Sequence, residues 1–368
     1  MKAEEYMGMA LALAEKGCGY VNPNPMVGAV IVKGGVVIGR GFHEKYGSLH
    51  AERNALTDCI ESPKSATMYV TLEPCCHYGK TAPCTQAIIE SGISEVLIGA
   101  TDPNPLVAGK GIEMLRCNGV KVTHGILQEE CERQNEVFFY YTKSKMPFVV
   151  MKYAMTRDGK IATHTGKSRW ISSEKARQNV HKSRHRYSGI MVGVNTVISD
   201  DPLLTCRLEG CRSPARIICD TNLRMPLDSR IVKTAHEITT YIATSNSDQE
   251  SRKPYSDAGC EILTISRKGP HINLHELMRH LGKQGIDSIL LEGGATLNYS
   301  ALQSGIVNRV QTYIAPKVFG GSCAPGPIGG IGIDATEQAF RLAESRITMF
   351  GEDILIESEV VKGVYGNC

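Results

Sequence analysis

Three residues with soft donor atoms and one carboxylate give this 368-residue sequence its clearest chemistry. The donors are His50, Cys75 and Cys84, and we take the two cysteines as ligands because each follows a proline. One imidazole and two thiolates could hold a zinc ion and leave its fourth position for water, whose pKa then falls to about 7. Glu52, two residues after the histidine, could carry the protons of that water. The pattern therefore predicts a catalytic zinc site.

The order of these residues is similar to that of the zinc-dependent nucleobase deaminases, in which His-x-Glu precedes Pro-Cys and a second cysteine. The spacing differs, because eight residues separate Cys75 from Cys84 where those enzymes usually have Pro-Cys-x-x-Cys. A structural zinc site is the alternative, and Cys76 or His77 could supply the fourth protein ligand that it requires. A structural site would, however, have no use for the carboxylate of Glu52.

Composition and charge narrow the class of protein. A formal net charge of +3 is small for this length and shows no excess of basic residues of the kind that nucleic-acid binding requires. Thirteen cysteines, an odd number in a long chain, argue against a secreted disulfide framework and for a reducing cytoplasm. The first residues lack the apolar core of a signal peptide, and no stretch is long enough to span a membrane. We expect a soluble, cytoplasmic protein without a nucleic-acid or membrane partner.

Alternating helix and strand signals predict an α/β domain over residues 1–145. A polar stretch that ends in Pro147 marks the boundary, a second α/β domain follows over 146–361, and 362–368 reads as a loose tail. Predicted strands of the first domain are 27–32, 36–41, 67–71, 96–100 and 120–122, with helices at 1–17, 50–59, after Cys84, and at 111–117. Predicted strands of the second are 148–154, 190–193, 216–220, 239–243, 288–292, 310–315 and 354–357, with helices at 173–187, capped by Ser173, and from 295 to 304.

The second domain carries weaker signals for an anionic ligand. Glu292-Gly293-Gly294 lies between a strand and a helix, so it could cradle a phosphate, although a tight turn explains it equally well and it is not the dinucleotide fingerprint. A charge-rich helix face such as that of 173–187 is usually just exposed to solvent. Arg184 on this helix and Arg207 become candidate ligand contacts only if a phosphate binds. Trp170, the single tryptophan, could stack on a planar cofactor, but the pattern favours a core position.

Taken together, the motifs resemble the family of bifunctional riboflavin-biosynthesis deaminase/reductases over nearly the whole chain, including the long gap between the two cysteines. In the first half they are residues 22–28 (Asn-Pro-Asn-Pro-Met-Val-Gly), 50–52 (His-Ala-Glu), 73–77 (Glu-Pro-Cys-Cys-His) and 83–84 (Pro-Cys). In the second half they are 152–154 (Lys-Tyr-Ala), 158–162 (Asp-Gly-Lys-Ile-Ala), 168–171 (Ser-Arg-Trp-Ile), 195–197 (Asn-Thr-Val), 200–205 (Asp-Asp-Pro-Leu-Leu-Thr) and 292–294 (Glu-Gly-Gly).

The resemblance implies a cytidine-deaminase-like three-layer α/β domain followed by a dihydrofolate-reductase-like α/β domain. It implies one zinc ion per chain and NADPH as cofactors, a phosphorylated aminopyrimidine as substrate, and a homodimer or homotetramer. The first domain would deaminate 2,5-diamino-6-(5-phosphoribosylamino)pyrimidin-4-one, and the second would reduce its ribosyl group to a ribityl chain. Rival interpretations are a nucleic-acid deaminase, a zinc-stabilised scaffold without catalysis, and a monofunctional deaminase with a non-reducing second domain.

Site residues also follow from the resemblance. It places Asn24, His43, His77, Lys80, Asp102 and Asn104 around the pyrimidine. It places Ala154, Trp170, Thr196, Asp200, Thr221, Gly294, Ala295, Thr296, Leu297, Asn298, Tyr299 and Ser300 around NADPH, and Ser168, Arg184, Leu204, Arg207 and Glu292 around the sugar phosphate. Reduction of a sugar carbonyl creates an alkoxide that needs a proton, and Lys152 and Asp200 are the candidates for supplying it.

Overall fold

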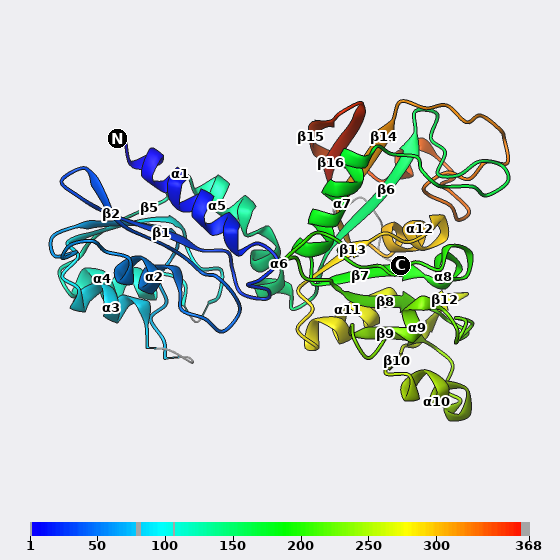
Figure 1. The fold of residues 1–368 in the computed structure, drawn as a ribbon, viewed down its shortest axis with the longest axis horizontal. Helices are drawn as coiled ribbons and strands as arrows, with labels where there is room; N and C mark the ends of the chain where they lie inside the picture. Colours follow the sequence, from blue (N-terminus) through cyan, green and yellow to red (C-terminus); the bar gives the residue numbers. More distant parts are fainter. Residues whose placement is uncertain (1, 79–81, 106, 362–368) are drawn as a thin grey trace. The chain divides into compact units, whose positions relative to one another are not determined.

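The computed structural model describes residues 2–78, 82–105 and 107–361, and it divides into two compact units, Met1–Lys145 and Met146 onward (Figure 1). Each unit has hydrophobic clusters of its own. Lys80 and the tail 362–368 lie outside the described residues. Within the described part of the chain, every helix is too short or too polar to cross a membrane.

A five-stranded sheet forms the middle layer of the first unit. Its order is β2-β1-β3-β4-β5, and β1 runs antiparallel to both of its neighbours, whereas β3, β4 and β5 are parallel. The strands are β1 Gly28–Lys33, β2 Val36–Phe42, β3 Thr67–Leu72, β4 Glu95–Ala100 and β5 Lys121–His124. Strands β3 and β4 are buried at nearly every position, as expected where helices cover both faces of a sheet.

Helices cover this sheet on both faces, which confirms the expected three-layer fold (Figure 1). One layer contains α2 Ala51–Thr57, α3 Cys84–Glu90 and α4 Lys110–Cys117, which bury Ala55, Ile88 and Leu115. The other contains α1 Ala3–Ala14 with the short helix η1 Glu15–Gly17, α5 Gln128–Gln134 and α6 Glu136–Ser144. The sequence did not predict α5 and α6. The five apolar or aromatic residues of α6 are consecutive, 137–141, so its sequence lacks the periodic apolar stripe that reveals a helix.

The second unit is built on a nine-stranded sheet of order β10-β9-β8-β7-β13-β6-β14-β16-β15. Neighbouring strands from β10 to β14 are parallel, and β16 and β15 continue the sheet in antiparallel pairs. The strands are β6 Phe148–Thr156, β7 Gly189–Gly193, β8 Ala215–Cys219, β9 Thr240–Thr244, β10 Glu261–Thr264, β13 Ser288–Leu291, β14 Val307–Ala315, β15 Leu342–Phe350 and β16 Asp353–Val360, with a separate pair β11 Arg267–Lys268 and β12 His271–Ile272.

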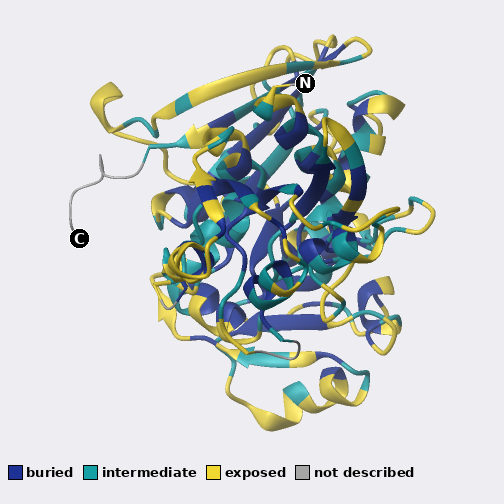
Figure 2. Cartoon of the chain, turned by 90° about the vertical axis from the view of Figure 1, so that its left-hand side faces the viewer, coloured by how far each residue is buried: buried dark blue, intermediate teal, exposed yellow. Residues whose placement is uncertain are grey.

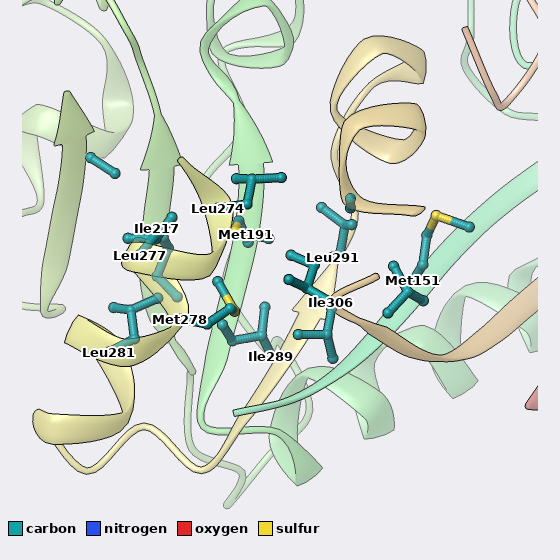
Figure 3. Packing of buried hydrophobic residues seen from close by; sticks show 14 of the residues in the cluster. Met151, Met191, Ile217, Leu274, Leu277, Met278, Leu281, Ile289, Leu291 and Ile306 are labelled. Carbon is teal, nitrogen blue, oxygen red and sulfur yellow. The ribbon is translucent and has the colours of Figure 1, made fainter. Parts of the chain in front are cut away.

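Consecutive strand residues point to opposite faces of this sheet, and each face has its own core. Met191 and Ile217 pack against Met278 of α11 Leu274–Lys283, on the face that also carries α12 Ala295–Gln303 (Figure 3). The neighbouring residues Ile190 and Ile218 belong to the opposite cluster, with α8 Val194–Asp200, α9 Arg230–Lys233 and α10 Gln249–Asp257. Figure 2 shows buried positions along the strands and exposed positions in the loops.

Two further elements complete the second unit. Helix α7 Glu174–Arg186 packs Ala176 and Val180 beside β14 and β16, and Ser173 caps it, as predicted, by accepting a hydrogen bond from the Ala176 N–H at 3.3 Å. A short helix, η2, spans Thr336–Gln338. Every strand predicted for this unit is present, but strands β10, β11, β12 and β15 and helices α8 to α11 were not predicted. Six of the nine β15 residues are exposed, four of them in a row, so this strand shows no apolar alternation.

Candidate functional site

Three elements of the first unit bring the predicted metal ligands together. His50 is the residue before α2, Cys75 lies three residues beyond β3, and Cys84 is the first residue of α3. Their ligand atoms all lie within 4.8 Å of one another. The His50 Nδ1 atom is 3.6 Å from the Cys75 Sγ and 3.4 Å from the Cys84 Sγ. One nitrogen and two sulfurs therefore converge on a single point.

The electrostatics of the two thiols fit a divalent cation. The contact with Cys84 lowers the pKa of Cys75 to about 4, with a further contribution from His50, whereas the same contact and burial raise the pKa of Cys84. The backbone N–H of Cys84 also donates to the Cys75 sulfur at 3.4 Å. Two adjacent thiolates, one half-buried and one buried, would repel each other, and a cation between them would remove that repulsion. Soft sulfur and imidazole donors suit zinc.

No fourth protein ligand joins this cluster among the residues that the structure describes. Cys76 and His77, the two residues considered for that role, are both described and are not part of it. Three protein ligands with one open position are typical of catalytic zinc, whereas structural zinc usually has four. The geometry thus favours the catalytic interpretation.

Glu52 lies in the first turn of α2, beside these ligands, and is 3% exposed. Burial is the main cause that raises the pKa of its carboxyl, and the neighbouring Cys75 adds to the effect. A carboxyl with a raised pKa can take up and release a proton closer to neutral pH. Glu52, His50 and Cys75 line one cavity of about 440 Å³, so a substrate could reach both the metal site and this carboxyl.

Five of the predicted pyrimidine-pocket residues line the same cavity: Asn24, His43, His77, Asp102 and Asn104. His43 is 3% exposed, and burial lowers the pKa of its imidazole. Its Nδ1 is 3.0 Å from the carbonyl oxygen of Leu49, which assigns the proton to Nδ1. Its Nε2 can then accept a hydrogen bond from the Asn24 side-chain amide at 3.2 Å. A neutral His43 thus orients Asn24 in the cavity wall.

Two buried side chains that the sequence did not single out hold the walls of this cavity. The carboxylate of Glu73 accepts the backbone N–H groups of Asp102, Gly109, Gly111 and Ile112 at 2.9 to 3.3 Å. Asn135 accepts from the Met26 N–H and donates to the Met26 carbonyl, both at 2.8 Å. Glu73 could have been suspected, because it is a carboxylate between an apolar strand and a metal ligand. Nothing in the sequence marked Asn135.

A buried cluster of charges lies in the second unit. Glu292, just after β13, accepts two hydrogen bonds from the Arg184 guanidinium, at 2.8 and 3.0 Å, and its carboxylate is 3.9 Å from the Lys152 ammonium. Burial opposes ionisation of Glu292, but Arg184 and Lys152 outweigh it and hold its pKa at about 2. Burial lowers the pKa of Lys152. The cluster therefore holds a fixed carboxylate between two cationic side chains.

A second cavity, of about 350 Å³, contains most of the predicted cofactor residues. Thr196, Thr221, Gly294, Ala295, Thr296, Leu297 and Ser300 line it. Two backbone segments lie close together here, because a Cβ atom added to Gly293 would lie 3.0 Å from the backbone nitrogen of Gly193. Helix α12 begins at Ala295, so its first N–H groups, which lack partners within the helix, lie at this turn and could bind an anion. The glycine turn and the helix start fit the diphosphate of a dinucleotide.

Other predicted cofactor residues do not line this cavity. The side chains of Asn298 and Tyr299 are buried and donate to the carbonyls of Pro327 and Gly332, because helical periodicity turns them away from the turn that carries Gly294. Ala154 lies on β6, and Asp200 ends α8. The expectation that Trp170 is a core residue is wrong: it is 61% exposed, and the Arg177 guanidinium lies 4.5 Å from its ring centre.

The predicted sugar-phosphate residues lie partly together. Arg184 joins Glu292 to the loop that follows α8, since it also donates to the carbonyl of Thr205 at 3.0 Å. Leu204 is buried in that loop, and the Arg207 N–H donates to the His181 imidazole at 3.3 Å. Ser168 is half-buried in the stretch that leads to Trp170, and no described contact links it to this cluster.

Two family models match the chain, one in each unit. Residues 1–100 match the cytidine and deoxycytidylate deaminase zinc-binding region, and residues 147–356 match the RibD C-terminal domain.

Relatives match nearly the whole chain. The riboflavin biosynthesis protein RibD of Actinobacillus pleuropneumoniae is 51% identical over 357 residues, which cover 97% of this chain and 95% of that protein. RibD of Escherichia coli strain K12 is 37% identical and covers 97% of this chain and 99% of its own length.

Solved structures agree with the sequence comparisons. Acinetobacter baumannii RibD, form 1, has a TM-score of 0.88 at 34% identity, covering 98% of this chain and 99% of its own. The diaminohydroxyphosphoribosylaminopyrimidine deaminase/5-amino-6-(5-phosphoribosylamino)uracil reductase of Thermotoga maritima has a TM-score of 0.85 at 37% identity, with the same coverage.

Both catalytic halves are thus present on one chain, a zinc-dependent deaminase followed by a reductase that uses NADPH. This favours the bifunctional interpretation over a monofunctional or nucleic-acid deaminase and over a scaffold. The chain belongs to the RibD family, the bifunctional deaminase/reductases of riboflavin biosynthesis.

Proposed function

We propose that this chain acts on the two substrates named for the Thermotoga maritima enzyme, with the deaminase in residues 1–145 and the reductase in residues 146–361. The convergence of His50, Cys75 and Cys84 beside the buried Glu52, on the wall of one cavity, is the observation that carries this proposal. The amino group to be removed would lie in that cavity. The second unit would then reduce the ribosyl group to a ribityl chain.

In the first unit, Glu52 is the group that moves protons. His50, Cys75 and Cys84 would hold zinc, which supplies an activated water and a Lewis acid when bound. Glu52 takes a proton from the attacking water and gives it to the leaving ammonia, which its raised pKa and its position on the cavity wall allow. Asn24, His43, His77, Asp102 and Asn104 orient the ring, and we keep Lys80 in this set on sequence grounds alone.

In the second unit, the charged cluster binds the sugar phosphate and handles the proton of the reduction. NADPH supplies the hydride when it is bound beside Gly294 and the start of α12. Glu292 holds Arg184 in place, and Arg184 and Arg207 carry the positive charge that a phosphate requires. Ser168 and Leu204 would complete the substrate site. The cofactor site would be completed by Ala154, Trp170, Thr196 and Thr221. Lys152 is the better placed of the two proton-donor candidates, because it is buried in this cluster, whereas Asp200 is exposed.

Mass spectrometry of the products tests both halves together. The zinc-loaded protein is given the diaminopyrimidine ribosyl phosphate, first without and then with NADPH. We expect an amino-to-oxo exchange in the first sample, and a further gain of two hydrogens only in the second. Exchange without the gain would contradict the reductase assignment, and no exchange would contradict the deaminase assignment.

We also propose that the protein is a cytoplasmic homodimer or homotetramer. All twelve described cysteines are free thiols, which suits a reducing compartment. Strand β15 is the edge of its sheet and exposes Leu342, Ile347 and Met349, by 47%, 66% and 58%. An exposed apolar edge strand favours self-association. Light scattering should give the mass of two or four chains, and the Ile347→Lys variant should have a lower mass. Cell fractionation should recover the protein with cytoplasmic enzymes. A monomeric wild type would contradict the assembly.

A further inference from the structure

A pair of neighbouring thiols lies outside the metal site, in the loop that follows α8. Cys206 and Cys211 are both half-buried free cysteines. Burial raises the pKa of Cys211, and the charge of Cys206 and a hydrogen bond to its sulfur add to the effect. The two sulfurs therefore lie side by side without a covalent bond between them.

The chain between the two cysteines is a turn that brings them together. The Cys211 N–H donates to the carbonyl of Leu208 at 3.3 Å, and Gly210 has a left-handed backbone with a φ of 70°. Glycine adopts this conformation without the steric cost that a Cβ would add. Because the turn and the contact between the sulfurs already exist, a disulfide would require a movement of this loop alone and not of a helix or strand.

The same loop connects two proposed substrate contacts to helix α7. The carbonyl of Thr205 accepts a hydrogen bond from Arg184 at 3.0 Å, and the N–H of Arg207 donates to the His181 imidazole at 3.3 Å. Between them in the sequence, the thiol of Cys206 donates to the His181 carbonyl at 3.2 Å. A sulfur that enters a disulfide has no hydrogen left to donate. Oxidation would therefore release Cys206 from α7 and displace the backbone that carries Thr205 and Arg207.

We propose that Cys206 and Cys211 form a reversible disulfide that weakens the binding of the phosphorylated substrate to the reductase. The oxidant is a low-molecular-weight disulfide, RSSR, such as oxidised glutathione. One cysteine thiolate attacks RSSR, forms a mixed disulfide and expels RS⁻. The other thiolate then attacks the protein sulfur of that mixed disulfide, forms the bond between the two cysteines and expels the second RS⁻. Two protein thiols are oxidised, one RSSR is reduced to two RSH, and the two protein protons pass to the expelled thiolates.

This exchange connects the redox state of the surroundings to the reductase. In a reducing compartment the pair stays in the thiol form, and it is oxidised when the ratio of oxidised to reduced glutathione rises. The inference rests on the proposed reductase function and adds a means by which that function is regulated. The deaminase unit does not contain this loop, so its activity should not respond.

The test exposes the zinc-loaded, full-length protein to oxidised glutathione and follows the cross-link and the activity separately. Mass spectrometry of peptides should show residues 206 and 211 joined, with the loss of two hydrogens, and dithiothreitol should reverse this change. We expect the KM for the deaminated substrate in the NADPH-dependent reaction to rise about tenfold in the oxidised protein, the effect of losing about one hydrogen bond to a charged group. The rate of ammonia release from the deaminase substrate should stay the same.

The double variant Cys206→Ser/Cys211→Ser shows whether these two thiols cause the response. Its serine at 206 can still donate to the His181 carbonyl, so the variant should keep the KM of the reduced wild type, with or without oxidised glutathione. Cys323→Ser is the matched control, because Cys323 is an exposed thiol of the same unit. This variant should form the cross-link and respond as the wild type does.

Three results would overturn the inference while leaving the reductase function standing. They are the absence of the cross-link in the oxidised wild type, an unchanged KM once the cross-link has formed, and a rise in KM that persists in the double variant. A reduced wild-type protein that does not reduce the substrate would instead overturn the proposed reductase function, and its regulation with it.

Discussion

Glu52 has the two properties that a proton carrier in a deaminase needs, a place beside the metal ligands and a raised pKa caused by burial. Glu52→Gln keeps the shape of the side chain but cannot accept the proton of the attacking water. We expect the rate of ammonia release to fall about a hundred- to ten-thousandfold. Zinc content, measured by elemental mass spectrometry, should stay at one per chain, because Glu52 is not one of the clustered ligands.

Glu44→Gln is the matched control for this prediction. Glu44 is exposed and does not line the cavity, so its replacement should leave the rate of deamination unchanged. Deamination by the Glu52→Gln protein at the wild-type rate would show that another group carries the proton.

The lowered pKa of Glu292 predicts that the stability of the second unit depends on pH. Arg184 and Lys152 outweigh burial and hold its pKa at about 2, against an ordinary value of 4.5. A carboxyl whose pKa is lower in the folded state stabilises the fold above its unfolded pKa and loses this contribution as pH falls through the folded pKa. The shift corresponds to about 3 kcal/mol, so the free energy of unfolding of the second unit should fall by about that amount between about pH 5 and pH 2.

Denaturant titrations followed by tryptophan fluorescence measure this change, because Trp170 is the only tryptophan and lies in the second unit. Glu292→Gln should be less stable at neutral pH, where it leaves two cations without their partner, and should lose less stability on acidification. Glu359→Gln, which removes a half-exposed partner of Arg309, should keep the wild-type slope. An unchanged slope in Glu292→Gln would contradict the assignment.

At the scale of elements, Glu73 fastens the start of α4 and the loop before it to the end of β3. One carboxylate oxygen accepts the N–H groups of Gly111 and Ile112, and the other accepts those of Asp102 and Gly109. The same loop carries Asp102 and Asn104 into the cavity wall. Glu73 therefore sets the position of two proposed substrate contacts relative to the proposed zinc ligand Cys75, two residues away along the chain.

Replacement of Glu73 by Gln should loosen that connection. Whichever way its amide is turned, the NH₂ group faces two backbone N–H donors that lose their acceptor, at a cost of about 1–3 kcal/mol each. We expect the KM for the deaminase substrate to rise about tenfold or more, with kcat less affected, while reduction by the second unit is unchanged. Glu73→Asp keeps both oxygens and should recover part of the affinity. A parallel loss of kcat and zinc without a change in KM would instead indicate a general structural role.

Sequence patterns predicted the elements that have a complete apolar face, and missed those that do not. Strands such as β3 and β7 were found because their residues are almost all buried between helices. Helix α6 and strand β15 bury few residues or none, so no periodicity marked them. The zinc cluster could be predicted because its residue types are rare in combination. The role of Glu73 could only be suspected from its place between an apolar strand and a metal ligand, and that of Asn135 could not be predicted, since its partners are backbone groups of Met26, distant in sequence.

For the whole molecule, the two units have separate cores, and we expect them to be separable proteins. The clusters around Ala55 and Tyr6 contain residues of the first unit alone, and those around Leu277 and Ile231 contain residues of the second alone. Both ligand cavities described above are likewise lined within one unit each. A chain cut between Lys145 and Met146 crosses neither core, so each half keeps the apolar burial that stabilises it.

Separate expression of residues 1–145 and 146–368 tests this expectation. The first piece should bind one zinc ion and release ammonia from the deaminase substrate, and the second should bind NADPH and reduce the deaminated product. Cooperative thermal unfolding of each piece would show that it folds by itself, and mixing the two pieces should restore the complete reaction, because the intermediate can diffuse between them. The expectation is contradicted if either piece unfolds without cooperativity, or if the second piece binds NADPH only when the first is covalently attached. Either result would show that each unit needs the other for its stability, although their cores are separate.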